Sequence, residues 1–288
     1  QLSLVNMSLE LTLTENKTKL DKLCHKEAKA FLRLRRTFQT FIDIYANAIY
    51  LHSLEKTGHI YRVAAHARLM AQQLDCDKLT VFQIYCAGLL YEAGKLATPQ
   101  DILTKPMSQL NQRELAQFEL YNHQSAQMLA PIAELTQVCL IIEHLNEQVD
   151  GGGRPNHLSG DDIPLGSKIL AIIIDFDNLI IGRMTGQAEL VESAIGQLKK
   201  MEGIRYDAKL LSQYIDLIIN RTTAQEGKIE YPIDLKNIKP EMLLSQDVSL
   251  AGQPPLLTKD TILTEKHIEK LAQLVHSNNA LSTIFVSG

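Results

Sequence analysis

The sequence predicts a mainly α protein, in which a helical bundle follows a long, coiled-coil-like helix and precedes a small β-rich C-terminal appendage. Three observations predict this class. Residues 6–55 contain no Pro or Gly, apolar residues recur at helical spacing between residues 60 and 220, and short β-prone runs broken by Pro, Gly and Asp follow Gly227. We expect three segments: a signalling helix over 1–53, a helical domain over 54–226 and a small α+β extension over 227–288.

The composition limits the classes of partner. The chain has 288 residues, of which 45% are hydrophobic, enough to fill a packed core. Its formal net charge of -4, with both signs mixed, gives no basic surface of the kind that nucleic acid requires. The sequence has neither a run of 18 uncharged apolar residues nor a signal-peptide pattern. We therefore expect a cytoplasmic protein that binds neither nucleic acid nor membrane.

The first segment has the pattern of a dimerising helix. Its apolar residues are spaced 3, 4, 3 and 4 apart, which is an a/d seam: Phe31, Leu34, Phe38, Phe41 and Tyr45. We expect the part before residue 30 to pair with a second copy of the chain and the later part to join the core. The predicted assembly is a homodimer formed through this helix.

The later elements follow from apolar periodicity and from the residues that end each run. The periodicity predicts helices over residues 60–74, 79–90, 112–130, 132–146, 165–181, 188–200 and 207–220. Pro131 suits the start of the fourth of these helices, and the Gly- and Pro-rich loop from Val149 to Pro164 precedes the fifth. After Gly227 we expect short strands, followed by a helix over 265–274.

Four segments carry a resemblance to a known family. They are "EKTGHIYRVAAHARLMAQQL" from Glu55, "GLLYEAGKLATPQDILTKP" from Gly88, "HLNEQVDGGGRPNHLSGDDIPLGSKILAIIIDFDNL" from His144 and "YDAKLL" from Tyr206. In this order and spacing they resemble the HD-GYP family, bacterial hydrolases of cyclic di-GMP built on the all-helical HD fold. The resemblance implies an HD-superfamily helical bundle. With the long first helix, it also implies the output part of a response regulator in two-component signalling.

The resemblance implies a metal centre whose ligands this chain has largely replaced. In the family, imidazoles and carboxylates hold two or three iron or manganese ions, which activate a water and neutralise the phosphodiester. The residues that fall on ligand positions here are different ones: Tyr91, Glu92, Tyr121, Leu145, Asn146 and Ile174. Weak candidates for metal ligands remain: Glu55, His59 and Glu92. We expect no bound metal, no other cofactor and no catalytic residue.

Several cations of the family pattern are retained. Lys95, Lys168 and Arg183 resemble positions near the phosphates of the bound dinucleotide, and Arg154 takes the place of the tyrosine in the GYP signature. Guanidinium groups suit phosphates because they donate two parallel hydrogen bonds. These four residues are the candidates for binding a ligand.

The function that this pattern favours is a catalytically inactive, HD-GYP-like regulatory module of bacterial signalling. It would act through contact with a signalling protein or by sensing a nucleotide, with cyclic di-GMP as one possible ligand. The alternative is a weakly active, metal-dependent cyclic di-GMP phosphodiesterase with a reduced iron or manganese site, formed by Glu55, His59, Glu92 and the shifted histidines His123 and His144. An offset of one residue turns a helical side chain by about 100°, which argues against the shifted histidines.

Overall fold

The structure is a computed structural model, and it describes residues 17, 29, 37–52, 59–219, 230–235, 238–248, 256–277 and 283–287. The chain divides into two compact units, Gln1–Tyr45 and Ala46–Gly288. Each unit is described by itself.

The expected long helix is described in its last part. Residues 37–52 are helical, as are the isolated positions Lys17 and Lys29, while the seam residues Phe31 and Leu34 lie outside the described residues. The rings of Phe41 and Tyr45 stack with their centroids 6.0 Å apart, and Phe41 is 41% exposed. The seam residues in this stretch therefore keep an aromatic surface that faces solvent.

The second unit is mostly helical, as predicted. Its helices up to residue 219 are α2 (His59–Gln73), α3 (Lys78–Leu90), α4 (Gln100–Leu103), α5 (Gln112–Glu119), α6 (Tyr121–Leu129), α7 (Thr136–Glu143), α8 (Leu165–Ile180), α9 (Val191–Lys199) and α10 (Ala208–Ile219). Short 3-10 helices connect some of them: η1 (Ala93–Ala97), η2 (Met107–Gln109), η3 (Ala133–Leu135) and η4 (Gly160–Asp162).

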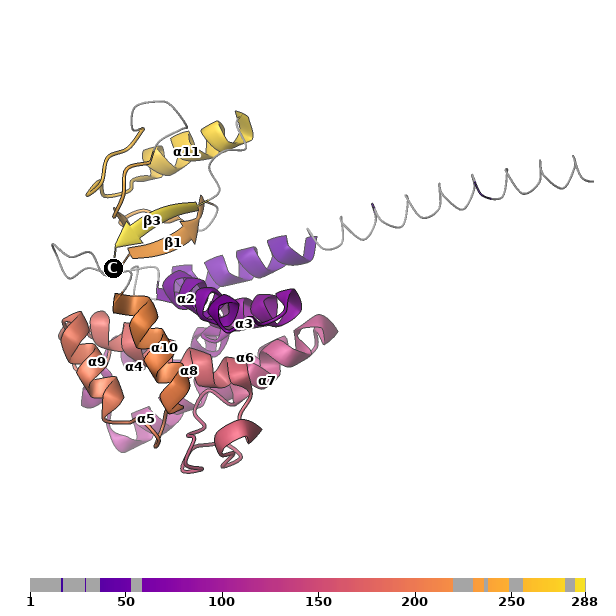
Figure 1. Cartoon of the computed structure of the whole chain (residues 1–288), viewed down its shortest axis with the longest axis vertical. Helices are drawn as coiled ribbons and strands as arrows, with labels where there is room; N and C mark the ends of the chain where they lie inside the picture. The colour runs from indigo at the N-terminus through magenta and orange to yellow at the C-terminus, as the bar shows by residue number, and fades with distance from the viewer. Residues whose placement is uncertain are drawn as a thin grey trace, which may run out of the picture. The chain divides into compact units, whose positions relative to one another are not determined.

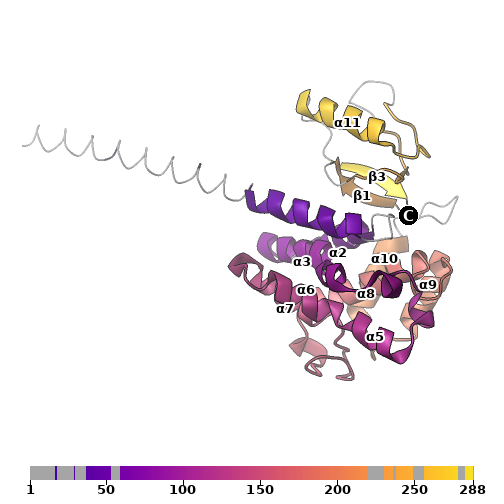
Figure 2. The ribbon, with the colours of Figure 1, turned by 180° about the vertical axis from the view of Figure 1, so that it is seen from behind.

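Helices α2 and α3 pack side by side, as both ribbon views show (Figures 1 and 2). A glycine permits their close approach, because a Cβ atom at Gly88 would lie 2.8 Å from the Cα atom of Ala64. The Asp77 side chain accepts hydrogen bonds from the backbone of Leu79 and Thr80, so it caps the free N–H groups at the start of α3. Helix α3 ends at Leu90, and the backbone N–H of the next residue, Tyr91, donates to the Ala87 carbonyl.

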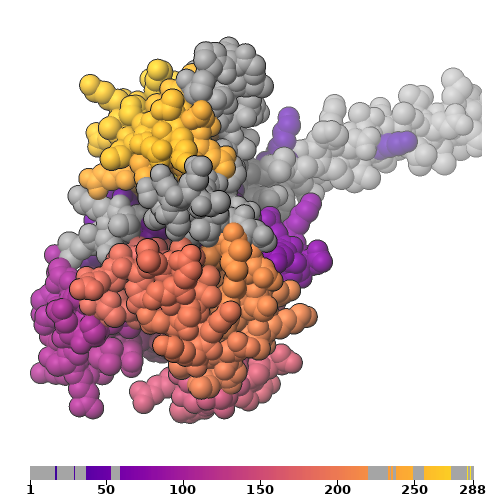
Figure 3. Space-filling view, turned by 60° about the vertical axis from the view of Figure 1, so that its left-hand side comes forward, coloured from indigo at the N-terminus to yellow at the C-terminus, as the bar shows by residue number. Residues whose placement is uncertain are grey.

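Helix α8 is the central helix of the bundle. It contacts α2, α3, α7, α9 and α10, and most of its residues are buried. Figure 3 shows α9 and α10 on one face of the molecule, where they cover this part of the core. Since α8 is surrounded, polar residues on it must find partners inside the protein.

Two predicted helices differ from the observed ones. Residues 112–130 form two helices that meet at Leu120, and the helix expected to begin at residue 132 starts with the 3-10 turn η3 and becomes α-helical only at Thr136. The periodicity missed the first break because apolar residues continue across it. Helix α7 ends at Glu143, so Leu145 and Asn146 lie beyond the helix, and helical phase does not describe their direction.

The C-terminal part contains a three-stranded antiparallel sheet in the order β1 (Glu230–Asp234), β3 (Thr283–Ser287), β2 (Leu243–Leu244). Ile233 pairs with Ile284 and Leu244 pairs with Val286, and all four side chains are buried. Helix α11 (Glu265–Ser277) covers the helix predicted over 265–274. Among the helices that the structure describes, none has the length and apolar character needed to cross a bilayer.

Candidate functional site

A buried polar cluster joins α2, the end of α3 and α8. Its six residues come from segments that carry the family resemblance, and they are His59, Arg62, Tyr91, Glu92, Lys95 and Asp177. The name buried polar cluster is used below for these residues. Five of them are almost fully removed from water and the Lys95 side chain is 11% exposed, so each charge in the cluster needs a partner within it.

The carboxylate of Asp177 on α8 is bonded to the guanidinium of Arg62 and the imidazole of His59, both on α2. Arg62 donates two hydrogen bonds to its carboxylate, from Nε to Oδ1 at 2.9 Å and from Nη2 to Oδ2 at 2.8 Å, and His59 Nδ1 also contacts Oδ2. Burial disfavours the charged form of Asp177, but Arg62 and His59 outweigh it and hold the pKa of this carboxyl well below its usual range. Asp177 is therefore ionised at neutral pH, and it anchors the start of α2 to α8.

The other ring nitrogen of His59 meets Tyr91. The Tyr91 hydroxyl is hydrogen bonded to Nε2 of His59, and the Tyr91 side chain is fully buried. We assign Nδ1 as the protonated nitrogen, because it faces the Asp177 carboxylate and leaves Nε2 to accept the Tyr91 hydroxyl. Both ring nitrogens of His59 are thus engaged by protein groups.

The charge of Glu92 is neutralised by Lys95, three residues later in the chain. Lys95 Nζ forms an ion pair with Glu92 Oε1, and His59 Nε2 lies 3.6 Å from the same oxygen. Lys95 also lies over the rings of Tyr121 and Phe118, 5.3 Å and 5.7 Å from their centroids. Burial disfavours the charged form of Glu92, but Lys95 and His59 outweigh it and hold the pKa of Glu92 below its usual range. The carboxylate is ionised and already paired.

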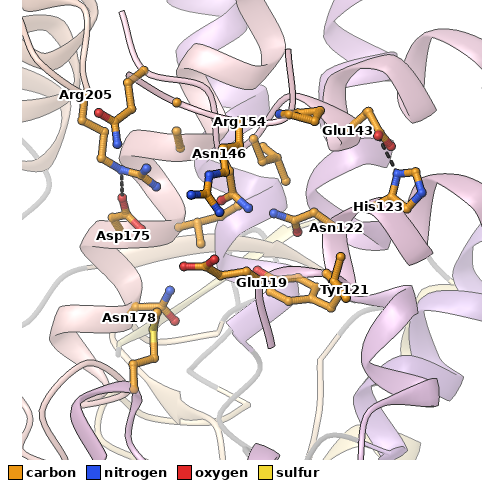
Figure 4. A pocket seen from close by; sticks show the side chains of 18 of the residues that line it. Glu119, Tyr121, Asn122, His123, Glu143, Asn146, Arg154, Asp175, Asn178 and Arg205 are labelled. Atoms are coloured by element: carbon orange, nitrogen blue, oxygen red, sulfur yellow. Dashed lines mark hydrogen bonds and ion pairs between the residues drawn. The ribbon is translucent and has the colours of Figure 1, made fainter. Parts of the chain in front are cut away.

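The other positions that the family resemblance assigns to ligands line a pocket beside the cluster. The pocket has a volume of about 940 Å³, and its walls include Tyr121, Leu145, Asn146 and Ile174. Figure 4 shows Tyr121 and Asn146 at this pocket. Burial, followed by the charges of Glu92 and Asp175, raises the pKa of Tyr121 far above its usual range. Leu145 and Ile174 offer no lone pair, Asn146 offers an amide, and Tyr121 stays a neutral phenol.

Of the four cationic side chains predicted to bind a ligand, only one lines this pocket. Arg154 lines it, while Lys95 belongs to the buried polar cluster. Lys168 donates to the Gly160 carbonyl and to Asp161, and Arg183 is buried and donates to the carbonyls of Leu103 and Lys105. The four candidates thus lie in different surroundings, and the structure does not gather them around one ligand position.

The shifted histidines His123 and His144, and Asp175 next to Ile174, also have hydrogen-bond partners. His123 Nδ1 lies 2.6 Å from Glu143 Oε1, and His144 is bonded to the Leu140 carbonyl through Nδ1 and to Asn156 through Nε2. Asp175 accepts hydrogen bonds from Arg205 Nε and the Tyr206 hydroxyl, both at 2.7 Å. These groups line or border the pocket as bonded pairs.

The described residues do not fit a multinuclear metal centre. Glu55 lies outside the described part of the chain, and no group of three or more His, Cys, Asp and Glu side chains within that part is arranged to hold a metal ion. A metal at His59 and Glu92 would have to displace the Tyr91 hydroxyl and the Lys95 ammonium. Each displaced group would lose a buried partner, which opposes binding.

Sequence reasoning missed two features of this site. The bonds of Asp177 were not predicted, because its link to His59 joins positions 118 apart, which no local pattern reveals. Asn122 was not singled out, although it lines the pocket and is 4% exposed. The pairing of Lys95 with Glu92 has i, i+3 spacing, so that contact could have been found from the sequence.

Comparisons with known proteins agree on the family. A family model described as HD domain matches residues 43–210. A 3'3'-cGAMP-specific phosphodiesterase of Vibrio cholerae is 30% identical over 185 residues, which are 64% of this chain and 35% of that protein. A cyclic di-GMP phosphodiesterase response regulator of Xanthomonas campestris is 30% identical over 158 residues, 54% of this chain and 40% of that protein. The chain thus spans well under half the length of these two relatives.

A similar solved structure is the crystal structure of a cyclic GMP-AMP specific phosphodiesterase of Vibrio cholerae. The two share 19% sequence identity and align with a TM-score of 0.48, over 62% of this chain and 49% of the other.

Proposed function

This chain belongs to the HD-domain family, and we propose that it is a non-hydrolytic, HD-GYP-like regulatory module of bacterial signalling. It would act by binding a nucleotide or a partner protein without turning over a phosphodiester. The observation that carries this proposal is the closed hydrogen bonding of the buried polar cluster, in which Tyr91 occupies Nε2 of His59 and Lys95 neutralises Glu92.

The charges of the cluster support the proposal. Two cationic side chains, Arg62 and Lys95, balance two carboxylates, Asp177 and Glu92. A divalent ion added to this balanced set would introduce charge that no carboxylate is left to neutralise. Removing one member of a buried ion pair costs about 3–5 kcal/mol, so opening the cluster for a metal would also oppose binding.

The chemistry of the replaced positions points the same way. Metal-dependent hydrolysis needs a water activated by a cation that several imidazoles and carboxylates hold. At these positions the pocket presents Leu145, Ile174 and a Tyr121 phenol that stays protonated. Such walls can enclose a ligand, but they supply no group that would hold the activating ion.

A second candidate function is a phosphodiesterase with a reduced metal site. It is favoured by the names of the curated relatives, which are cyclic dinucleotide phosphodiesterases at 30% identity. In this chain His59, Glu92 and the neighbouring His123 and His144 would have to exchange their present partners for an ion.

Turnover distinguishes the two candidates. The chain would be incubated with cyclic di-GMP and with 3'3'-cGAMP in the presence of Mn²⁺ or Fe²⁺ and without oxygen, and the products separated by chromatography. We expect no linear dinucleotide and no mononucleotide above the rate in metal-containing buffer alone. Linear product formed in proportion to protein, and abolished by His59→Ala, would establish the second candidate in place of the first.

A further inference from the structure

Lys239, which lies between β1 and β2 in the C-terminal extension, links that extension to two helices of the second unit. Its ammonium donates a hydrogen bond to Asn47 Oδ1 at 2.6 Å. It also lies over the rings of Tyr50 and Tyr61, 5.4 Å and 5.3 Å from their centroids. Asn47 and Tyr50 belong to the last two turns of the helix over 37–52, and Tyr61 lies in the first turn of α2. The name Lys239 latch is used below for these four residues.

The surroundings of the ammonium make this contact stronger than one at an open surface. Tyr50 and Tyr61 are 8% and 4% exposed, and their ring centroids lie 5.9 Å apart with the ring planes tilted by 56°. Lys239 itself is half-buried. A cation is attracted more strongly to a ring when both are shielded from water, and this ammonium meets two rings and a side-chain carbonyl. The latch therefore restrains the extension against the end of the first helix.

Other residues of the extension lie against the same part of the bundle. Burial, followed by the negative charge of Glu241, raises the pKa of the Tyr50 hydroxyl, so a second residue of the extension acts on this helix. Ile238, which precedes Lys239, is 3% exposed, and β1 contacts α2. The extension is thus docked through apolar and charged groups together.

The first turn of α2 is held from two directions. Arg62 ties it to Asp177 on α8, while Tyr61 of the same turn lies under the ammonium of Lys239. Asn47 is 192 positions away from Lys239 in the chain, so the bond between them joins segments that the sequence keeps far apart. A displacement of the first helix would have to break that bond, because helices shift as packed units.

We propose that the Lys239 latch is a conformational device that couples the position of the first helix to the docking of the C-terminal extension. With the latch closed, one ammonium holds the end of that helix, the first turn of α2 and the extension together. Movement of the helix would open the latch and loosen the extension. Loosening of the extension would in turn free the end of the helix, because coupling between two sites is reciprocal. The coupling is independent of the proposed function, since the latch residues neither belong to the buried polar cluster nor line the pocket.

Hydrogen–deuterium exchange of the whole chain, read by mass spectrometry, tests the coupling from both sides. Lys239→Met keeps most of the side-chain length but removes the ammonium, and we expect amide exchange in residues 46–52 to become faster by about fivefold or more. Asn47→Ala removes the acceptor on the helix, and we expect exchange in residues 238–248 to become faster by about threefold or more. In each variant the effect is expected in the segment that was not mutated.

Two matched variants separate the coupling from a general loosening of the fold. Lys259→Met makes the same chemical change at an exposed position of the extension and should leave exchange in residues 46–52 unchanged. Lys239→Arg keeps a cation above the two rings and should retain most of the protection. Circular dichroism establishes that each variant is folded, and if Lys239→Met does not fold, Asn47→Ala carries the test.

Faster exchange confined to the mutated segment, with the other segment at its parent rate, would overturn the coupling. Equal effects of Lys239→Met and Lys259→Met on residues 46–52 would overturn it as well. Hydrolysis of cyclic di-GMP by the chain would refute the proposed function and leave the latch unaffected, so the two proposals fail separately.

Discussion

His59 has both ring nitrogens bonded to protein groups, which supports the proposed absence of a metal site. Tyr91 falls where the family resemblance places a ligand histidine, and its hydroxyl also takes the Nε2 lone pair of His59. With Asp177 on the opposite nitrogen, the ring is held in place from both sides. The residue that most resembles a surviving ligand therefore acts here as a bridge between α3 and α8.

Asp177→Asn tests the ion pairing that anchors this bridge. The change leaves Arg62 buried without its carboxylate, so we expect a loss of about 3–5 kcal/mol in the free energy of unfolding at pH 7. Urea denaturation followed by circular dichroism measures it. Asp162→Asn, at an exposed position of η4, is the matched control and should change stability little.

The same variant should alter the dependence of stability on pH. The pKa of Asp177 lies below its unfolded value of about 4, so the unfolded chain binds the proton more readily. The stabilisation is complete above the unfolded pKa and is lost as pH falls through the folded pKa. Between pH 5 and pH 2, roughly, the parent chain should lose more stability than Asp177→Asn does. Parallel acid curves for the two proteins would contradict the ion pair.

Lys95→Met tests whether the ammonium of Lys95 stabilises the buried carboxylate of Glu92. The variant keeps most of the length of the side chain but leaves the buried Glu92 carboxylate without its ammonium, so we expect a loss of about 3–5 kcal/mol in stability. Adding Glu92→Gln removes the unpaired charge and should recover much of that loss. Lys105→Met breaks the more exposed pair with Glu114 and should have a much smaller effect. Equal losses for the two lysine variants would contradict the role given to Lys95.

At the scale of helices and strands, local pattern predicted most of what lies between residues 59 and 219. Helices α2, α3, α8, α9 and α10 lie within a few residues of the expected ranges. The break at Leu120 could not be predicted from apolar spacing, because Phe118 and Tyr121 are both buried and the apolar pattern continues across the break. An available signal was the capping box of Asn111 and Glu114, which marks the start of α5 but not its end.

The candidate site was predictable in its parts but not in its connections. The positions that the family resemblance assigns to ligands follow from their order along the chain, and four of them line one pocket. Which groups replace the metal interactions depends on long-range contacts such as Arg62 with Asp177, and sequence spacing does not determine those. Arg183 is an example: the sequence suggested a phosphate ligand for it, but its guanidinium donates hydrogen bonds to the carbonyls of Leu103 and Lys105.

The first helix carries a prediction about assembly. The sequence predicts pairing before residue 30, but Phe41 is 41% exposed and its ring stacks on that of the half-buried Tyr45, so we propose that the homodimer seam extends into this later part of the helix. Phe41→Asp would place a charge in that seam, so we expect a dimer at micromolar concentration to dissociate into monomers. Light scattering coupled to size exclusion measures the mass, with Gln39→Asp on the same helix as the control. An unchanged mass for Phe41→Asp would place the dimer contact elsewhere or exclude it.

At the scale of the whole molecule, the helices of the HD domain surround a charge-balanced interior. Helices α2 and α3 pack closely through Gly88, and beside the pocket the carboxylates of the buried polar cluster are balanced by Arg62 and Lys95. A fold of this kind can present a ligand-dependent surface to other proteins without chemistry. We therefore propose that the chain holds no resident metal cluster, because such a cluster would have to break the bonds that His59 makes to Tyr91 and Glu92 makes to Lys95.

Elemental analysis of the whole chain, purified without chelator from cells supplied with iron and manganese, tests that claim most directly. We predict iron and manganese far below one ion per chain, with no change in thermal stability when Mn²⁺ is added. About two ions per chain, retained through gel filtration and lost in His59→Ala, would contradict the account.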